Sequence, residues 1–216
     1  MIFLDSGNIK EIKKYMKMGV IRGVTTNPTI MKRDGVTDID KSVKEISEIV
    51  YPYPLSVEVT SNNKKEIIKQ SKHYSLIKNN INIKIPIHGP NGELEYLELI
   101  NELSDMNITL NVTAMMSAQQ GLLAMLAGAK YLSLFCGRIN DMGYDSNLEL
   151  NKLRKIIDSN KSNSEIIAAS SREVYNIVDW IDNGAHIVTV SPNLLEKCII
   201  NPKSKETVKQ FLDDAK

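Results

Sequence analysis

The sequence predicts an α/β fold, a (β/α)8 TIM barrel that forms a single domain over residues 1–216 with an additional C-terminal helix. Two observations support this prediction. Short apolar runs rich in Ile, Val and Leu alternate with longer amphipathic segments, which is typical of a parallel sheet covered by helices. Eight such units can be counted, and eight strands close a barrel. An open, doubly wound sheet is the alternative, although no glycine-rich nucleotide-binding motif follows any strand.

The expected strands are short and follow one another in a regular order along the chain. They lie at residues 2–5, 22–26, 54–60, 81–87, 108–113, 130–136, 165–169 and 186–190. In several of them apolar residues alternate with polar ones. In a barrel covered by helices the apolar side faces the helices, so the polar side must face the lumen.

Helical periodicity fills the intervals between these strands. Two clear apolar faces are Ile9, Ile12 and Met16 in residues 8–18, and later Val174, Ile177, Val178 and Ile181. Helix ends are expected at Gly19, Gly128 and Gly184, and helix starts at Asp5-Ser6 and Ser170-Ser171. Residues 203–214 fit a last amphipathic helix, with Val208, Phe211 and Leu212 on one side.

Composition and charge narrow the possible partners and the compartment. The chain is 42% hydrophobic and 25% charged, with a net charge of +1, which is ordinary for a globular protein and gives no nucleic-acid footprint. No apolar stretch reaches transmembrane length, and the N-terminus does not have the layout of a signal peptide. Cys136, Cys198 and the three histidines show no metal-binding spacing. We therefore expect a cytoplasmic protein with no nucleic-acid partner, no membrane partner and no metal.

Lys84 is the most informative single residue, because it is the one charged residue in the apolar strand at residues 80–87. Burial disfavours the charged ammonium and frees the amine lone pair, which Schiff-base chemistry on a carbonyl requires. A strand-edge lysine that reaches solvent is the alternative. The polar sides of the expected strands would bring further groups to the lumen beside Lys84, namely Asp5, Asn27, Glu58, Asn111, Thr113 and Ser133.

Three of these residues also have a purely structural interpretation. Asp5 could cap the first helix, and Asn27 before Pro28 could be a turn residue. Glu58 could be a structural partner of Lys84. The set as a whole favours a functional site, because the residues come from successive strands, mostly near the C-terminal ends, where barrel enzymes keep their chemistry.

With these residues assembled, the chain resembles the small transaldolase family, whose members are class I (Schiff-base) barrels and include fructose-6-phosphate aldolases. The resemblance covers essentially the whole chain. Its most specific landmarks are Thr25-Thr26-Asn27-Pro28 and Lys84-Ile85-Pro86, in this order and spacing. Other landmarks are Asp5, Ser56-Val57-Glu58-Val59, Asn111-Val112-Thr113, the segment from Ser133 to Arg138, Ala169-Ser170-Ser171-Arg172 and Thr189-Val190-Ser191-Pro192.

The resemblance implies the reaction and the catalytic roles. A dihydroxyacetone unit would pass from fructose 6-phosphate or sedoheptulose 7-phosphate to an aldose phosphate, with no cofactor. Lys84 would form the Schiff base, and Asp5 would act as general acid and base. Glu58 and Thr113 would hold the water that relays protons with Asp5.

The resemblance also implies the binding residues and an assembly. Asn27 and Asn111 would bind substrate hydroxyls, and Ser133 the dihydroxyacetone end. Arg138, Ser170 and Arg172 would bind the sugar phosphate, since a guanidinium fork suits phosphate oxygens. As an alternative, Arg172 could be a surface residue in the first turn of its helix. The family implies a homo-oligomer, a pentamer or decamer, with the C-terminal helix on a neighbour.

Two positions distinguish the transaldolases of this family from its aldolase-like members. Aldolase-like members tend to carry glutamine in place of Glu58 and tyrosine in place of Phe135, so this chain has the transaldolase pattern. A phenyl ring at Phe135, which we expect at the substrate, cannot donate the proton that a tyrosine could give to the enamine. The chain departs from the common family pattern at Ser6-Gly7, Leu134 and Ser191, which flank the chemistry and could alter substrate range or loop stability.

Two other hypotheses remain alternatives. A related Schiff-base barrel such as a deoxyribose-phosphate aldolase would also use a lysine in the lumen, but the Thr-Thr-Asn-Pro strand end and the position of Lys84 argue against it. A barrel that binds a sugar phosphate without turning it over is the non-enzymatic alternative, and it predicts no covalent adduct at Lys84.

Overall fold

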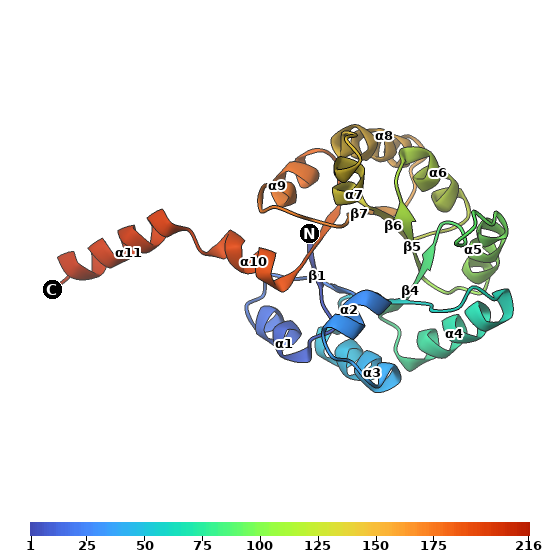
Figure 1. Ribbon diagram of the computed structural model, residues 1–216, viewed down its shortest axis with the longest axis horizontal. Coiled ribbons are helices and arrows are strands. Elements are labelled where there is room, and N and C mark those ends of the chain that lie inside the picture. Colours follow the sequence, from blue (N-terminus) through green and yellow to red (C-terminus); the bar gives the residue numbers. More distant parts are fainter.

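The computed structural model describes residues 1–216, and its eight strands form a closed parallel barrel (Figure 1). The strands are β1 (Ile2–Asp5), β2 (Val24–Thr25), β3 (Leu55–Glu58), β4 (Ile81–Pro86), β5 (Leu110–Met115), β6 (Tyr131–Leu134), β7 (Glu165–Ala168) and β8 (Ile187–Val190). They follow in sequence order around the barrel, and β8 pairs with β1 to close it. The predicted (β/α)8 fold is confirmed, although the second strand is much shorter than residues 22–26.

Helices surround the barrel as an outer ring, except for the C-terminal helix, which extends away from it (Figure 1). They are α1 (Ile9–Lys17), α2 (Pro28–Arg33), α3 (Ile39–Val50), α4 (Lys64–Ile77), α5 (Glu95–Asp105), α6 (Ala118–Leu126), α7 (Cys136–Asp141), α8 (Ser146–Ser159), α9 (Tyr175–Asp182), α10 (Pro192–Ile199) and α11 (Pro202–Asp214). The short helices α2 and α7 follow directly after β2 and β6. They therefore lie at the C-terminal ends of the strands.

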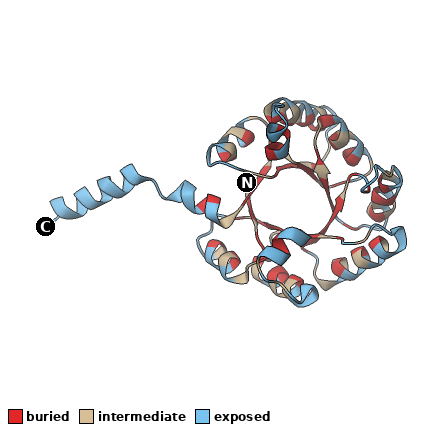
Figure 2. Cartoon of the chain, in the orientation of Figure 1, coloured by how far each residue is buried: buried red, intermediate tan, exposed pale blue.

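The main hydrophobic core lies between the strands and the helices, where Figure 2 shows the buried faces of both. A second, small apolar cluster of Phe3, Ile167 and Ile187 fills part of the lumen, with Tyr131 packed against it. Phe3, Tyr131 and Ile187 lie in the first half of their strands, and Ile167 lies near the middle of β7. The lumen is thus apolar toward the N-terminal ends of these strands, and polar residues occupy the opposite end.

The helix ends predicted at three glycines are confirmed, but two of the predicted helix starts are wrong. Gly19, Gly128 and Gly184 have φ values of 69°, 95° and 105° just after α1, α6 and α9, where glycine relieves the strain of a left-handed residue. The N-cap of α1 is Asn8, whose side chain accepts hydrogen bonds from the backbone amides of Lys10 and Glu11. Asp5 and Ser6 do not cap this helix. This leaves Asp5 at the end of β1.

The expected apolar face of α9 is also wrong. Ile177 is buried, but Val174, Val178 and Ile181 are exposed, and the fully buried residue of this helix is Trp180. The helix begins at Tyr175, five residues after Ser170, so Ser170-Ser171 does not start it. Tertiary packing selected a different side of the helix from the one that periodicity favours.

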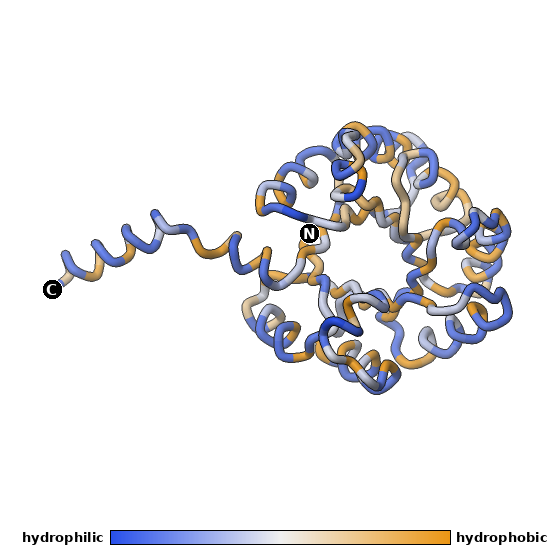
Figure 3. The backbone as a smooth tube through the Cα atoms, in the orientation of Figure 1, coloured by the Kyte–Doolittle hydropathy of each residue, from blue (hydrophilic) through white to orange (hydrophobic).

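The helix expected at residues 203–214 forms, and it projects away from the barrel as α11 (Figures 1 and 2). All of its residues are exposed, including the apolar Val208, Phe211 and Leu212. Figure 3 shows hydrophobic positions recurring along this helix. No helix in the structure combines the length and the apolarity needed to span a membrane.

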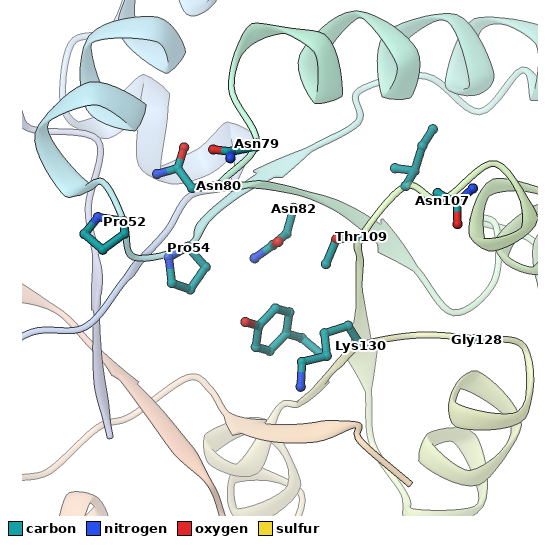
Figure 4. A pocket seen from close by; sticks show the side chains of 11 residues that line it. Pro52, Pro54, Asn79, Asn80, Asn82, Asn107, Thr109, Gly128 and Lys130 are labelled. Atoms are coloured by element: carbon teal, nitrogen blue, oxygen red, sulfur yellow. The ribbon is translucent and has the colours of Figure 1, made fainter.

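A polar cavity of about 520 Å3 opens at the N-terminal ends of β3 to β6 (Figure 4). Two of the asparagines in its lining have structural roles. Asn80 donates to the carbonyl oxygens of Ser47 and Tyr53, and Asn107 adopts a left-handed turn with φ of 60°. This end of a barrel normally serves stability, and the chemically distinctive groups lie at the opposite end.

Candidate active site

Residues at the C-terminal ends of the strands enclose a small cavity with a water-accessible volume of about 80 Å3. Five strands, the helix α7 and the loops after β2, β6 and β7 contribute. The lining residues are Asp5, Thr25, Asn27, Lys84, Ser133, Phe135, Arg138, Ala169, Ser170 and Thr189. Seven of them were predicted from the sequence: all except Thr25, Ala169 and Thr189.

Lys84 lies inside the barrel, with its side chain only 6% exposed. Its Nζ is 2.9 Å from Oε2 of Glu58 and donates to the carbonyl oxygen of Thr26 at 3.2 Å. The parallel register pairs Glu58 with Lys84, so both side chains point to the same side of the sheet. The predicted lumenal position of Lys84 is therefore confirmed, and the amine faces a carboxylate as well as the cavity.

Asp5 ends β1 and is held from the neighbouring strand. The Thr25 hydroxyl donates to Oδ1 of Asp5 at 2.8 Å and also contacts the hydroxyl of Thr189. Burial raises the pKa of Asp5, while the charge of Lys84 and the hydrogen bond from Thr25 lower it in part. The net pKa lies above the ordinary value, so this carboxyl group is easier to protonate than a surface aspartate.

A hydrogen-bonded chain of buried side chains lies beside Lys84. Asn111 donates to the Ser56 hydroxyl at 3.0 Å and accepts from the Ser133 hydroxyl at 2.7 Å. Asn111 is fully buried and does not line the cavity, whereas Ser133 does. The chain fixes the orientation of Ser133 toward the cavity.

Thr113 is also buried, two residues after Asn111 on β5. Its hydroxyl has no hydrogen-bond partner among the protein groups. A buried hydroxyl without a protein partner needs another group to bond with, which is a common feature of functional sites. Thr113 and Glu58 lie outside the lining of the cavity.

The basic side of the cavity is formed by α7 and the loop after β7. Arg138 lines the cavity, with its guanidinium carbon 5.3 Å from the centre of the Phe135 ring. Ser170 has a left-handed backbone with φ of 65°, and its carbonyl oxygen lies so close to Gly137 that a side chain there would overlap it. Gly137 therefore lets the loop that carries Ser170 approach α7 closely.

Arg172 also lies outside the lining of the cavity, and the structure holds it on the protein surface. Its Nη2 donates to Oδ2 of Asp141 at 2.8 Å, and both side chains are more than half exposed. It precedes α9 and does not lie in the first turn of that helix. Asp141, at the end of α7, thus holds Arg172 on the surface.

Thr25, Thr189 and Ser56 are the residues that sequence reasoning missed. Thr25 lies within the Thr-Thr-Asn-Pro segment, and the register that pairs it with Asp5 turns it inward. Alternation along the strands would have placed all three hydroxyls in the lumen. Their role as partners of other site residues requires the barrel geometry.

Other reactive groups do not form a second centre. No cluster of three or more His, Cys, Asp or Glu side chains is arranged to hold a metal ion. Both cysteines are free, and burial raises the pKa of Cys136 to about 12, so that thiol stays protonated near neutral pH.

Fold and site together define a (β/α)8 barrel with a buried lysine–carboxylate pair and an arginine at the C-terminal end of its strands. The model of the transaldolase/fructose-6-phosphate aldolase family matches residues 2–216. The chain belongs to this family, as its motifs predicted.

Curated relatives agree with this assignment over nearly their whole length. A protein of Streptococcus equi subsp. equi is 39% identical over 98% of this chain and 96% of its own. Proteins of Carboxydothermus hydrogenoformans and Oceanobacillus iheyensis are 37% and 36% identical, over 99% and 98% of this chain and 96% of each relative. All three are named "Probable transaldolase".

Proposed function

We propose that this protein is a transaldolase that transfers a dihydroxyacetone unit between sugar phosphates through a Schiff base on Lys84. The observation that carries the proposal is the amine of Lys84, buried at the cavity 2.9 Å from the Glu58 carboxylate and close enough to Asp5 to influence its pKa. A buried amine between two proton-accepting groups is suited to nucleophilic attack on a ketose carbonyl. The names of the relatives support the same reaction.

The first half of the reaction forms the covalent intermediate. Lys84, after giving a proton to a neighbouring carboxylate, attacks C2 of the ketose to form a carbinolamine. Asp5, whose raised pKa favours the protonated form, gives its proton to the departing hydroxyl, which leaves as water. The resulting protonated imine withdraws electrons from the C3–C4 bond.

The second half transfers the three-carbon unit. Asp5, now ionised, removes the proton of the C4 hydroxyl, the C3–C4 bond breaks and an aldose leaves. The electron pair of that bond stays in the three-carbon fragment, which is now an enamine bound to Lys84. The enamine attacks the carbonyl carbon of a second aldose while Asp5 returns its proton to the aldehyde oxygen. Water then adds to the new imine, and the product ketose and the free amine are released. The reaction uses no metal or organic cofactor.

The remaining predicted site residues would have supporting roles in this sequence of steps. Glu58 and Thr113 would hold the water that carries protons to and from Asp5, and the unpartnered Thr113 hydroxyl supports this role. Asn27, Asn111 and Ser133 would hold the sugar hydroxyls. The phosphate would bind to the guanidinium groups of Arg138 and Arg172 and to Ser170.

The proposed donors are fructose 6-phosphate and sedoheptulose 7-phosphate, and the acceptors are erythrose 4-phosphate and glyceraldehyde 3-phosphate. This assigns the protein to the pentose phosphate pathway in the cytoplasm. Cleavage of fructose 6-phosphate with release of dihydroxyacetone is the alternative, because the family includes both activities. Glu58 and Phe135 favour transfer.

We further propose that the chain forms one barrel domain that assembles into a homo-oligomer, a pentamer or decamer, through α11. This helix exposes Val208, Phe211 and Leu212 and buries none of its residues. Light scattering after chromatography would test the assembly. Removal of residues 201–216 should lower the molar mass to that of a single chain, and an unchanged mass would contradict a role for α11.

The decisive assay measures glyceraldehyde 3-phosphate released from fructose 6-phosphate with and without erythrose 4-phosphate. Release that depends on the acceptor would support transfer, and equal release without it would support cleavage. Borohydride added with fructose 6-phosphate should attach the sugar carbon chain to Lys84 in the wild type and leave Lys84→Met unmodified. Lys130→Met is the matched control, because Lys130 pairs with Glu165 at the opposite end of the barrel. Absence of an adduct and of product release would refute the proposal.

A further inference from the structure

The turn that follows Asp5 is tied to α2 by the carboxylate of Asp34. The Gly7 amide and the Ser6 hydroxyl donate to Oδ2 of Asp34 at 2.8 Å and 3.1 Å. The Ser6 oxygen in turn accepts from the Asn8 amide at 3.0 Å. Ser6 is 1% exposed and the Asp34 side chain 11%, so water competes little for these bonds. They fix the backbone directly after Asp5.

The helix α2 connects this turn to a second site residue. Asn27 caps its N-terminus by accepting from the Ile30 amide at 2.8 Å, and it also lines the cavity. Asp34 follows its last residue as the C-cap. Gly7 packs so closely on α2 that a Cβ there would lie 2.7 Å from the sulfur of Met31. The turn and the helix therefore form one packed unit with Asp5 at one end and Asn27 at the other.

Arg33 neutralises Asp34 without breaking this arrangement. Its Nε and Nη2 donate to the two carboxylate oxygens at 2.7 Å and 3.1 Å. Burial alone would raise the pKa of Asp34, but the hydrogen bonds from Arg33 and Gly7 hold that pKa below its ordinary value. The carboxylate thus stays ionised near neutral pH and remains a strong acceptor.

We propose that Asp34 is a positioning residue for Asp5, because it fixes the turn after β1 against α2 and so sets how the Asp5 carboxyl and the Asn27 amide face the substrate. The inference rests on the proposed function, in which Asp5 transfers protons. It also accounts for Gly7, one of the departures from the family pattern, because a side chain there would overlap Met31. Ser6 supplies a hydroxyl to Asp34, and Gly7 supplies an amide and leaves room for Met31.

Asp34→Asn tests this role, because it keeps the size of the side chain and removes its charge. Glu149→Gln is the matched control. Glu149 likewise accepts from a backbone amide, that of Ala118, and pairs with Lys152, both at 2.7 Å, and its side chain is 17% exposed. We expect Asp34→Asn to lower kcat by about tenfold, since displacement of a catalytic group by a fraction of an ångström is costly. KM should stay within about twofold, and the control should keep both constants within about twofold.

An equal fall in kcat for both variants would show that Asp34 serves only stability and would overturn the proposal. If Asp34→Asn does not fold, Ser6→Ala removes one of the bonds and should lower kcat by about threefold with an unchanged KM. A kcat equal to that of the wild type would then count against the role.

A substrate-free measurement separates this inference from the proposed function. Carbon-13 NMR would follow the titration of the Asp5 carboxyl group. Its pKa is influenced by Lys84 on β4, by the Thr25 hydroxyl on β2, and by Arg33 and Asp34 at the C-terminal end of α2. Because the charge of Asp34 raises the pKa of Asp5, that pKa should fall in Asp34→Asn and stay unchanged in Glu149→Gln. If the wild type neither transfers nor cleaves, the proposed function fails, and this titration still shows whether Asp34 acts on the Asp5 carboxyl group. An unchanged pKa would refute it.

Discussion

Replacement of Thr25 by valine should remove the hydrogen bond that favours the ionised form of Asp5. The side chains have nearly the same shape, so the change isolates the hydroxyl. The bond is 2.8 Å long and joins a hydroxyl to a carboxylate, an interaction that contributes about 1.5–3 kcal/mol. Since about 1.4 kcal/mol corresponds to a tenfold change, we expect kcat at pH 7 to fall by roughly tenfold or more. The pKa of Asp5 should rise, because the bond from Thr25 lowers it.

The assay is kcat for transfer from fructose 6-phosphate to erythrose 4-phosphate, measured from pH 5 to pH 9. In the proposed mechanism bond cleavage needs ionised Asp5, so the acid limb of the Thr25→Val profile should move to higher pH. Thr25→Ser is the control, because it keeps the hydroxyl, and the acid limb of its pH profile should lie at the same pH as in the wild type. If the valine and serine variants have the same acid limb, the hydrogen bond does not control Asp5 and the reasoning fails.

Three further predictions follow from the site. Asp5→Asn should raise the free energy of urea unfolding at pH 7, because burial raises the pKa of Asp5 above its unfolded value near 3.8 and ionisation therefore destabilises the fold. That gain should vanish below about pH 4, and a gain independent of pH would refute the cause. Asp141→Asn should free Arg172 and lower KM for fructose 6-phosphate by up to about fivefold, since an exposed ion pair contributes at most about 1 kcal/mol; KM for unphosphorylated fructose should not change. Phe135→Tyr should raise cleavage relative to transfer, and an unchanged ratio of the two rates would contradict the role of Phe135.

The sequence could predict the barrel and the inward direction of its polar residues because strand geometry is local. Side chains alternate across a strand, so an apolar set that packs on the helices sends its neighbours into the lumen. This rule places Glu58 and Lys84 together once their strands are adjacent. Burial of Asn111 and Ser133 follows from the same rule.

Contacts between distant segments could not be predicted in this way. The bond from Gly7 to Asp34 joins residues that are 27 positions apart, and the pair of Arg172 and Asp141 spans 31. Periodicity also could not choose the buried face of α9, because Trp180 and the exposed Val178 both belong to apolar patterns. These features depend on how the loops and helices pack around the closed barrel.

The distribution of polarity along the lumen is itself an argument for function. Phe3, Ile167 and Ile187 show that this barrel can fill part of its interior with apolar side chains. The opposite end instead holds Lys84 and Glu58, whose desolvation costs free energy that a hydrophobic pair of the same volume would avoid. A purely structural role for this ion pair leaves that cost unexplained, because the same strands could pack more favourably without it. A role in covalent chemistry explains it, since a lysine exposed to water would lack both the nearby carboxylate and the enclosed cavity that the proposed reaction uses.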